Sequence, residues 1–164
     1  MYEEWAVIRE FPAYLVSTRG RIMRKDTRNE RTLSRTQYGD IRISFKVDGV
    51  VYNRSVKMLV AETWIPRPNE LFDSVIILDN VKDNLRIENL AWRPNWFAWK
   101  YARQFNANRV MGYSSRPVMN VETGVPYESI IDAAIANGEL FVDILRSIHG
   151  AGHIFPHRNE YTWY

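Results

Sequence analysis

The sequence of 164 residues predicts an α+β protein, and three patterns carry this prediction. Apolar and polar residues alternate on both sides of Asp48-Gly49, which is typical of a β-hairpin. A strand, strand, helix pattern occupies residues 74–106, and the order strand, helix, turn, helix, strand occupies residues 117–164. With 46% hydrophobic residues the chain has enough apolar surface for a packed core, so we expect an ordered protein.

The first predicted segment, residues 1–60, is a β-rich module. The stretch EEWAVIREFPAYLVSTRGRIMR has short apolar runs around Pro12, and Arg19-Gly20 indicates a tight turn between two strands. The stretch DIRISFKVDGVVYNRSV is predicted to be a hairpin, because a type I′ turn needs positive φ at both central residues and Asp48-Gly49 suits it. The intervening RKDTRNERTLSRTQYGD is too polar to bury, so we expect an exposed arm.

The second predicted segment, residues 61–111, contains the strand, strand, helix unit. A helix over VKMLVAETW leads into it and is stopped by IPRPNE. DSVIILDN is predicted to be a short buried strand, NVKDNLRIENL a polar loop, and NWFAWKYARQFNANR a helix with one aromatic face. We expect most of these aromatic side chains to pack in the core, and the alternative for one or two of them is stacking on a nucleic-acid base.

The third predicted segment, residues 117–164, follows the linker GYSSRP. A hairpin turning at Thr123-Gly124 precedes a helix that Ser129 caps and Gly138 ends. ELFVDILRSIHG predicts a second helix, and the terminal YTWY predicts a returning strand. This order is that of a small winged-helix-turn-helix-like unit.

The net charge of +3 is unevenly distributed along the chain. Residues 1–60 hold 12 Lys and Arg against seven Asp and Glu, whereas residues 117–164 hold two against six. Because a basic, arginine-rich segment attracts a polyanion, we predict that the first segment binds nucleic acid, with DNA as the expected form. The predicted nucleic-acid-binding residues are its basic side chains: Arg19, Arg21, Arg24, Lys25, Arg28, Arg31, Arg35, Arg42, Lys46, Arg54 and Lys57. The alternative is a solvated face in which Asp26, Glu30 and Asp40 pair with them.

The start of the second C-terminal helix is apolar and rimmed by acidic residues. A DNA-reading helix instead presents polar side chains at its N-terminal end. We therefore predict a binding site for a host or viral protein here, formed by Glu139, Leu140, Phe141, Val142 and Asp143. The alternative is that the apolar residues of this stretch belong to the core.

We predict neither a metal site nor a cofactor. The chain contains no cysteine, which excludes disulfides and thiolate ligands. His149, His153 and His157 follow one another at intervals of four, but the glycines and proline between them disfavour a zinc-binding helix, so we expect loop histidines.

Three blocks of the chain together resemble the HNH homing endonucleases of phage and intron origin. EEWAVIREFPAYLVSTRGRIMR is similar to the family's N-terminal module, with its E-x-W, P-x-Y-x-V-S and G-R-V/I pattern. VKMLVAETWIPRPNE and VIILDNVKDNLRIENLAW are similar to the two blocks of its HNH core, the second of which aligns without a gap. RPVMNVETGVPYESIIDAAIANG is similar to the family's nuclease-associated helix-turn-helix repeat.

The resemblance implies a ββα-metal core in which a bound metal ion and a histidine base activate water. In this chain Ile76 stands at the position of a metal ligand and Ile77 at the position of the base. Ala98 stands at the position of the second ligand, on the following helix. Lys57 stands where a histidine is usual in the first of the two core blocks. We therefore expect a degenerate HNH core without catalytic residues that keeps the framework of the family: Asp79, Asn84, Arg86, Glu88, Asn89, Leu90 and Trp92.

The leading hypothesis is an inactive, phage-encoded descendant of these nucleases that binds nucleic acid as a regulatory or accessory factor. Two alternatives stay open: a protein-interaction module acting through residues 139–143, and an HNH nuclease with non-standard ligands such as Asp79 and Asp83. The sequence has neither a signal-peptide pattern nor the roughly 20 apolar residues of a membrane span, so we expect a cytoplasmic protein.

Overall fold

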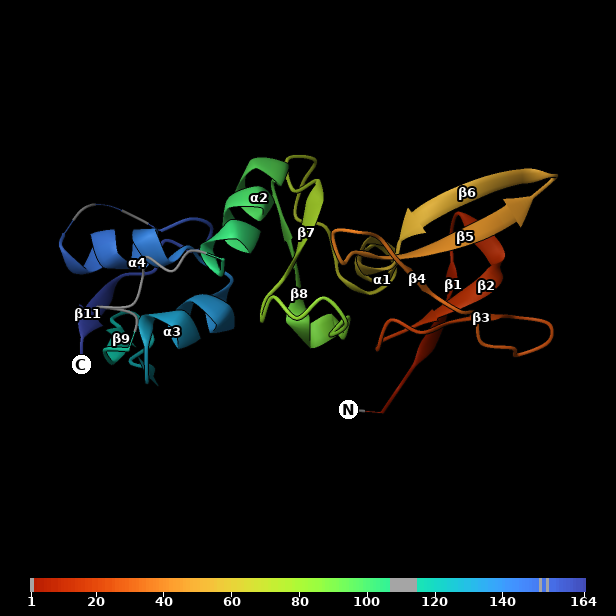
Figure 1. Ribbon diagram of the computed structural model, residues 1–164. Helices are drawn as coiled ribbons and strands as arrows, with labels where there is room; N and C mark the ends of the chain where they lie inside the picture. Colours follow the sequence, from red (N-terminus) through yellow and green to blue (C-terminus); the bar gives the residue numbers. More distant parts are fainter. Residues whose placement is uncertain (1, 107–114, 151, 153) are drawn as a thin grey trace. The chain divides into compact units, whose positions relative to one another are not determined.

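The computed structural model describes residues 2–106, 115–150, 152 and 154–164. The chain folds into two compact units, Met1–Ala98 and Trp99–Tyr164 (Figure 1). Each unit has its own cluster of buried apolar side chains. Small antiparallel sheets combine with short helices, which confirms the predicted α+β class. Among the helices in the described part of the chain, none is long and apolar enough to cross a membrane.

The first unit is built from three small antiparallel sheets and a central helix. One sheet has the order β1-β2-β3, with β1 at Trp5–Ile8, β2 at Phe11–Ser17 and β3 at Ile22–Arg24. A second has the order β4-β5-β6, with β4 at Ser34–Arg35, β5 at Ile41–Val47 and β6 at Val50–Ser55. The chain continues through α1 at Val56–Trp64, β7 at Ser74–Ile77, a 3-10 helix η1 at Ile87–Asn89, β8 at Leu90–Arg93 and α2 at Asn95–Gln104. Strands β7 and β8 pair with each other, which gives the predicted strand, strand, helix order.

The backbone angles confirm two predicted turns. In the β5–β6 turn, φ is 49° at Asp48 and 83° at Gly49, as a type I′ turn requires. In the β2–β3 turn, φ is 81° at Gly20, and a Cβ atom built there would lie 2.6 Å from the Cβ of Leu85. Glycine is needed at this position for its backbone conformation and because the loop before η1 approaches so closely.

One core joins the first two predicted segments. Val16 and Phe45 from the β-rich module share a buried cluster with Ala61, Val75 and Trp92 from the following segment. The predicted boundary at residues 60–61 falls within α1, inside this packed region. The β-rich module is therefore held directly against the ββα part of the first unit.

The second unit combines a three-stranded sheet with two helices. The sheet has the order β10-β9-β11, with β9 at Val118–Asn120, β10 at Pro126–Tyr127 and β11 at Tyr161–Trp163. Helix α3 spans Ile130–Asn137 and α4 spans Phe141–Ile148. The Ser129 side chain accepts a hydrogen bond from the Asp132 N–H at 3.0 Å, and Gly138 ends α3 with φ at 62°. These caps and the returning strand confirm the predicted element order.

Helix α2 buries only part of its aromatic side chains. Phe97 and Tyr101 are buried, as predicted. Trp96 and Trp99 are 54% and 60% exposed, so these two residues are the exceptions to the expected packing. Their positions fall on the opposite side of the helix from Phe97 and Tyr101, because successive helical residues are separated by about 100°.

Candidate nucleic-acid interface

The β4-β5-β6 sheet has one buried and one exposed face. Ile43 and Phe45 are buried, so the side chains that alternate with them along β5 project to the other side. Directly paired residues of neighbouring strands share a face, which extends the exposed side over β4 and β6. We call this side the outer face, and it consists of Ser34, Arg42, Ser44, Lys46, Val51, Asn53 and Ser55. The described side chains of the outer face are basic or neutral, without a carboxylate.

Several cations of the predicted set are free of carboxylate partners. Five of them form no ion pair with any described residue: Lys25, Arg28, Arg31, Arg42 and Lys46. Arg42 and Lys46 belong to the outer face. The Arg31 guanidinium donates to the Ser44 carbonyl at 3.5 Å but lies over the Tyr14 ring, which packs against the buried Phe45. Arg42 and Lys46 can therefore meet an anionic ligand at one surface without breaking an ion pair.

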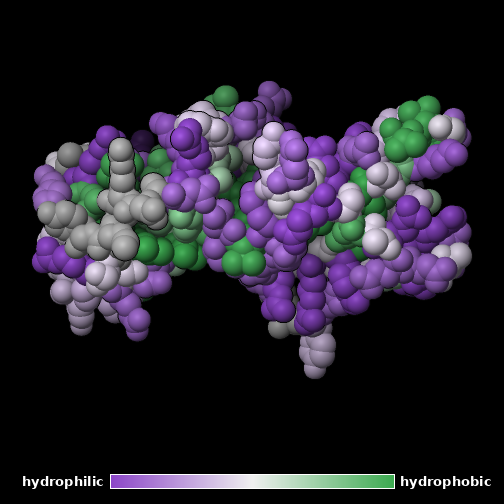
Figure 2. Space-filling view, viewed as in Figure 1, coloured by the Kyte–Doolittle hydropathy of each residue, from purple (hydrophilic) through white to green (hydrophobic). Residues whose placement is uncertain are grey.

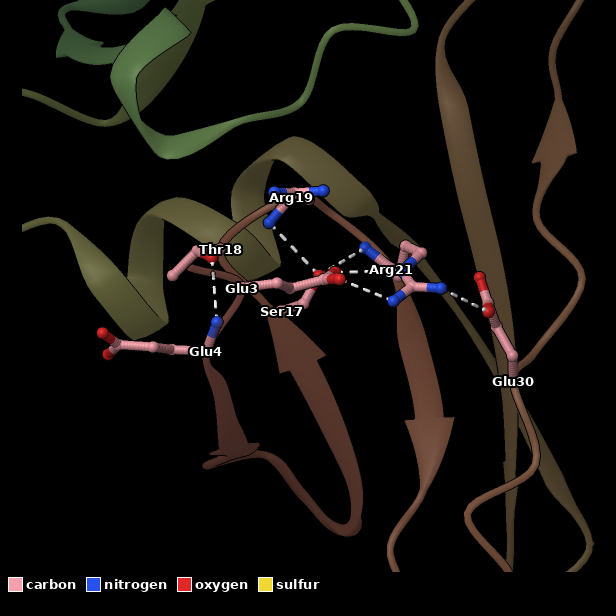
Figure 3. A network of polar contacts seen from close by, with 7 residues as sticks. All are labelled: Glu3, Glu4, Ser17, Thr18, Arg19, Arg21 and Glu30. Atoms are coloured by element: carbon pink, nitrogen blue, oxygen red, sulfur yellow. Dashed lines mark hydrogen bonds and ion pairs between the residues drawn. The ribbon is translucent and has the colours of Figure 1, made fainter. Parts of the chain in front are cut away.

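Four other arginines of the predicted set are held by carboxylates. Arg21 lies between Glu3 at 2.5 Å and Glu30 at 3.1 Å (Figure 3). The other pairs are Arg24 with Asp26, Arg35 with Asp83 and Arg54 with Glu10. The hydrogen bond from Arg21 lowers the pKa of Glu3 below its usual range. These four arginines therefore fit the alternative of a solvated face in which basic side chains pair with nearby carboxylates. Asp40, which was expected to take part in this pairing, instead pairs with Lys82.

The last two basic residues of the predicted set lie in different surroundings. Arg19 is exposed in the β2–β3 turn, beside Gly20. Lys57 is half-buried in α1, and burial lowers the pKa of its ammonium group. Lys57 is thus less suited to a phosphate contact than the exposed cations of the outer face.

The positions that the resemblance assigns to the metal ligand and the base are buried hydrocarbons. Ile76 and Ile77 lie in β7 and are 3% and 8% exposed. They pair with Ala91 and Leu90 of β8, and Ala98 lies on the following helix α2. None of these aliphatic side chains can coordinate a cation or accept a proton.

Asp79 closes the loop after β7. Its carboxylate accepts hydrogen bonds from the Asn84 side chain at 2.6 Å, the Asn89 side chain at 2.8 Å and the Val81 N–H at 2.8 Å. Burial acts to raise the pKa of Asp79, but the hydrogen bonds favour the ionised form and together outweigh burial, so the pKa is lowered. Asn89 also binds the loop to β7, because its carbonyl accepts from the Leu78 N–H at 2.9 Å. These contacts give the framework residues a structural role.

The residues considered for metal binding are dispersed. Among the described residues, no cluster of three or more His, Cys, Asp or Glu side chains could hold a metal ion. Asp83, the second carboxylate of the β7–β8 loop, pairs with Arg35. His149 and His157 are exposed, and His153 lies outside the described residues.

The predicted protein-binding stretch at residues 139–143 lies largely in the interior. Glu139, Leu140 and Phe141 are 0%, 6% and 5% exposed, whereas Val142 is 48% exposed. Asp143 is partly exposed and forms an ion pair with Arg146. The expectation of an exposed apolar face was wrong, because the turn between α3 and α4 directs these side chains into the core of the second unit.

Glu139 is a buried carboxylate with neutral hydrogen-bond donors. One oxygen accepts from the Asn159 amide at 2.6 Å, and the other accepts from the Tyr161 hydroxyl at 2.8 Å. Burial raises the pKa of Tyr161, and the charge of Glu139 adds to this effect. Glu139 therefore links the turn between α3 and α4 to Asn159 and to Tyr161 of β11 rather than facing a partner.

The neutral members of the outer face were missed from the sequence. Ser44, Val51 and Asn53 lie among the cations of this face, but a search for basic residues passes over them. Their position follows from the period of two along a strand and from the register that the Asp48-Gly49 turn sets. The predicted hairpin already contained both the strand period and the turn, so the sequence could have placed these neutral residues on the same face.

The paired strands β7 and β8, the loop closed by Asp79 and the following helix α2 define an HNH endonuclease-like fold. A solved structure described as "DNA binding and cleavage by the HNH homing endonuclease I-HmuI" is similar to this chain. The TM-score is 0.55 at 19% sequence identity, and the match covers 98% of each chain. This similarity confirms the fold implied by the resemblance. No family model and no curated protein matches the sequence.

Proposed function

We propose that this protein binds DNA through its N-terminal β-rich module and does not cleave it. The observation that carries the proposal is the outer face, where Arg42 and Lys46 lie at an exposed sheet surface without carboxylate partners in the described chain. The similar structure concerns DNA binding and cleavage by its own protein, which supports DNA as the ligand here.

The shape of the β5–β6 hairpin supports the same ligand. The major groove of B-form DNA admits a two-stranded β-ribbon, and its base edges present donors and acceptors to protein side chains. Arg42 and Lys46 supply cations for the phosphates, while Ser44 and Asn53 supply neutral hydrogen-bonding groups between them.

The proposed lack of cleavage is supported by the side chains of β7. Ile76 and Ile77 occupy the positions that the resemblance assigns to a metal ligand and a base, and both are buried. A DNA-binding protein of this kind would act as a regulatory or accessory factor, and the resemblance suggests a phage gene as its origin.

The binding proposal is tested by fluorescence anisotropy with a labelled 30-bp DNA duplex. Wild-type affinity is expected to fall steeply between 50 and 200 mM salt, because cations on the protein replace counterions on the phosphates. A double variant, Arg42→Gln with Lys46→Gln, is expected to bind about ten-fold more weakly and to reduce the salt slope by about two. Arg146→Gln with Arg158→Gln, which also removes two positive charges but from exposed arginines of the second unit, should leave both quantities unchanged. Equal losses in the two variants would contradict the proposed surface.

Cleavage is tested separately with supercoiled plasmid in Mg²⁺ or Mn²⁺, with and without EDTA. We expect no metal-dependent cleavage, so the plasmid should show the same amount of strand scission with and without EDTA. Scission that depends on the ion and is reduced more by Asp79→Ala than by Arg24→Ala would instead establish a nuclease with non-standard ligands.

A further inference from the structure

The end of the β5–β6 hairpin carries exposed apolar side chains. Val47, Val50 and Val51 are 40%, 52% and 57% exposed, and Figure 2 shows a hydrophobic patch at this end of the hairpin. Val51 lies on the outer face, directly opposite Lys46, whereas Val47 and Val50 pair with each other on the other side of the hairpin. Of these valines, Val51 therefore adjoins the cations proposed to bind phosphates.

The strand propensity of valine accounts for only part of this pattern. β-branched residues favour strands, but threonine meets the same preference with a polar group. Val51 is 57% exposed on the outer face, where its strand neighbour Asn53 and its partner Lys46 are polar. An exposed aliphatic side chain between polar and cationic groups suits a ligand that presents apolar groups among anionic ones.

We propose that Val51 contacts the C5-methyl groups of thymines, so that the hairpin favours A·T base pairs in the major groove. This inference rests on the proposed function, because it needs the outer face to lie against DNA. The thymine methyl is the apolar group that base edges present in that groove. Asn53, two residues along the same face, accepts a hydrogen bond from the Ser44 hydroxyl at 2.5 Å and has its Nδ2 available for the N7 acceptor of adenine.

The same contact distinguishes DNA from RNA. Uracil lacks the C5-methyl group, and the major groove of A-form RNA is too deep and narrow for a protein ribbon. The ligand that satisfies both the cations and the valine is thus double-stranded B-form DNA that contains thymine.

The test compares two duplexes that differ only in the methyl group: a 24-bp alternating dA-dT duplex and the matching dA-dU duplex. Wild-type protein is expected to bind the dA-dT duplex more tightly by a factor of about four for each methyl buried. Val51→Ser removes both methyl groups of valine and places a hydroxyl at the contact. It is expected to lose the preference while binding the dA-dU duplex as tightly as wild type.

Two controls separate methyl recognition from other effects. Val121→Ser changes a 50% exposed valine of the second unit and should keep the wild-type preference. Asp48→Asn removes the negative charge in the hairpin turn and should strengthen binding to both duplexes by the same factor.

Each outcome decides the inference. Equal wild-type affinity for the two duplexes, with a normal salt dependence, overturns the thymine contact but leaves the proposed function intact. A preference that persists in Val51→Ser assigns the discrimination to DNA shape and also overturns the contact. Absence of salt-dependent binding to either duplex overturns both proposals.

Discussion

Asp79 and Asn89 are joined by two hydrogen bonds that run in opposite directions. The Asn89 side-chain amide donates to the Asp79 carboxylate at 2.8 Å, and the Asp79 N–H donates to the Asn89 side-chain oxygen at 3.1 Å. The pair closes the loop between β7 and β8, and the nearby residues of β7, Ile76 and Ile77, are aliphatic. Asp79 and Asn89 therefore have a structural role, holding this loop in shape, that does not depend on catalysis.

Replacing Asp79 by asparagine is expected to destabilise the first unit by about 1–3 kcal/mol. One carboxylate oxygen becomes an amide nitrogen, which cannot accept the hydrogen bonds from Asn84 or Val81. Urea unfolding at pH 7 measures the loss. A change below 0.5 kcal/mol would show that the loop does not need this carboxylate.

The same variant should reveal a pH dependence. Because the pKa of Asp79 is lowered in the folded protein, its ionised form stabilises the fold above the unfolded-state pKa, near pH 4. That stabilisation is lost as the pH falls through the folded-state pKa. The difference in unfolding free energy between wild type and Asp79→Asn should therefore shrink between pH 5 and pH 3, and an undiminished difference would contradict the assignment.

Gly20→Ala is expected to cost about 2–3 kcal/mol of unfolding free energy, because it adds a close contact to an unfavourable backbone angle. The new Cβ would lie 2.6 Å from the Leu85 Cβ, so the loop before η1 would have to move. Gly124→Ala is the matched control, since its φ is 69° and no other atom lies within 4 Å of the added carbon. It should cost only about 1 kcal/mol, and equal losses in thermal or urea unfolding would argue against the close packing.

Tyr161→Phe is expected to destabilise the second unit by about 1.5–3 kcal/mol. The change removes the hydroxyl that donates to the buried Glu139 carboxylate at 2.8 Å. Val142→Ala, at an exposed position of α4, should stay within about 0.5 kcal/mol of wild type. Comparable losses would indicate that the Tyr161 hydroxyl contributes no more to stability than an exposed side chain of α4. The measurement is urea unfolding followed by tryptophan fluorescence.

Ile77→His, which introduces the residue type that the resemblance assigns to the base, is expected to destabilise the first unit by about 2–4 kcal/mol. A polar imidazole would replace a side chain that is 8% exposed and belongs to the core cluster. Ile77→Val keeps the environment apolar and should cost only about 0.5–1.5 kcal/mol. Similar unfolding midpoints for the two variants would show that the site tolerates a polar residue.

Local chemistry in the sequence determined the elements of this protein. The Asp48-Gly49 turn, the Ser129 cap and the Gly138 end of α3 each depend on residues within a few positions of one another, so the sequence is sufficient to predict them. The alternation along β5 and β6 likewise placed Arg42 and Lys46 on one side of a hairpin. The sequence also showed that Ile76 and Ile77 stand at the expected metal-ligand and base positions, but only through the resemblance to the HNH family.

Only the tertiary structure decided which charged and apolar residues are accessible. Arg35 is paired with Asp83, 48 positions away in the sequence, and Arg54 is paired with Glu10, 44 positions away. Leu140 and Phe141 turned out to be buried because α3, α4 and β11 enclose them, although their helix pattern suited either a core or a surface. The physical reason is that ion pairing and burial depend on which distant segments meet, whereas turns and caps depend on the backbone angles of adjacent residues.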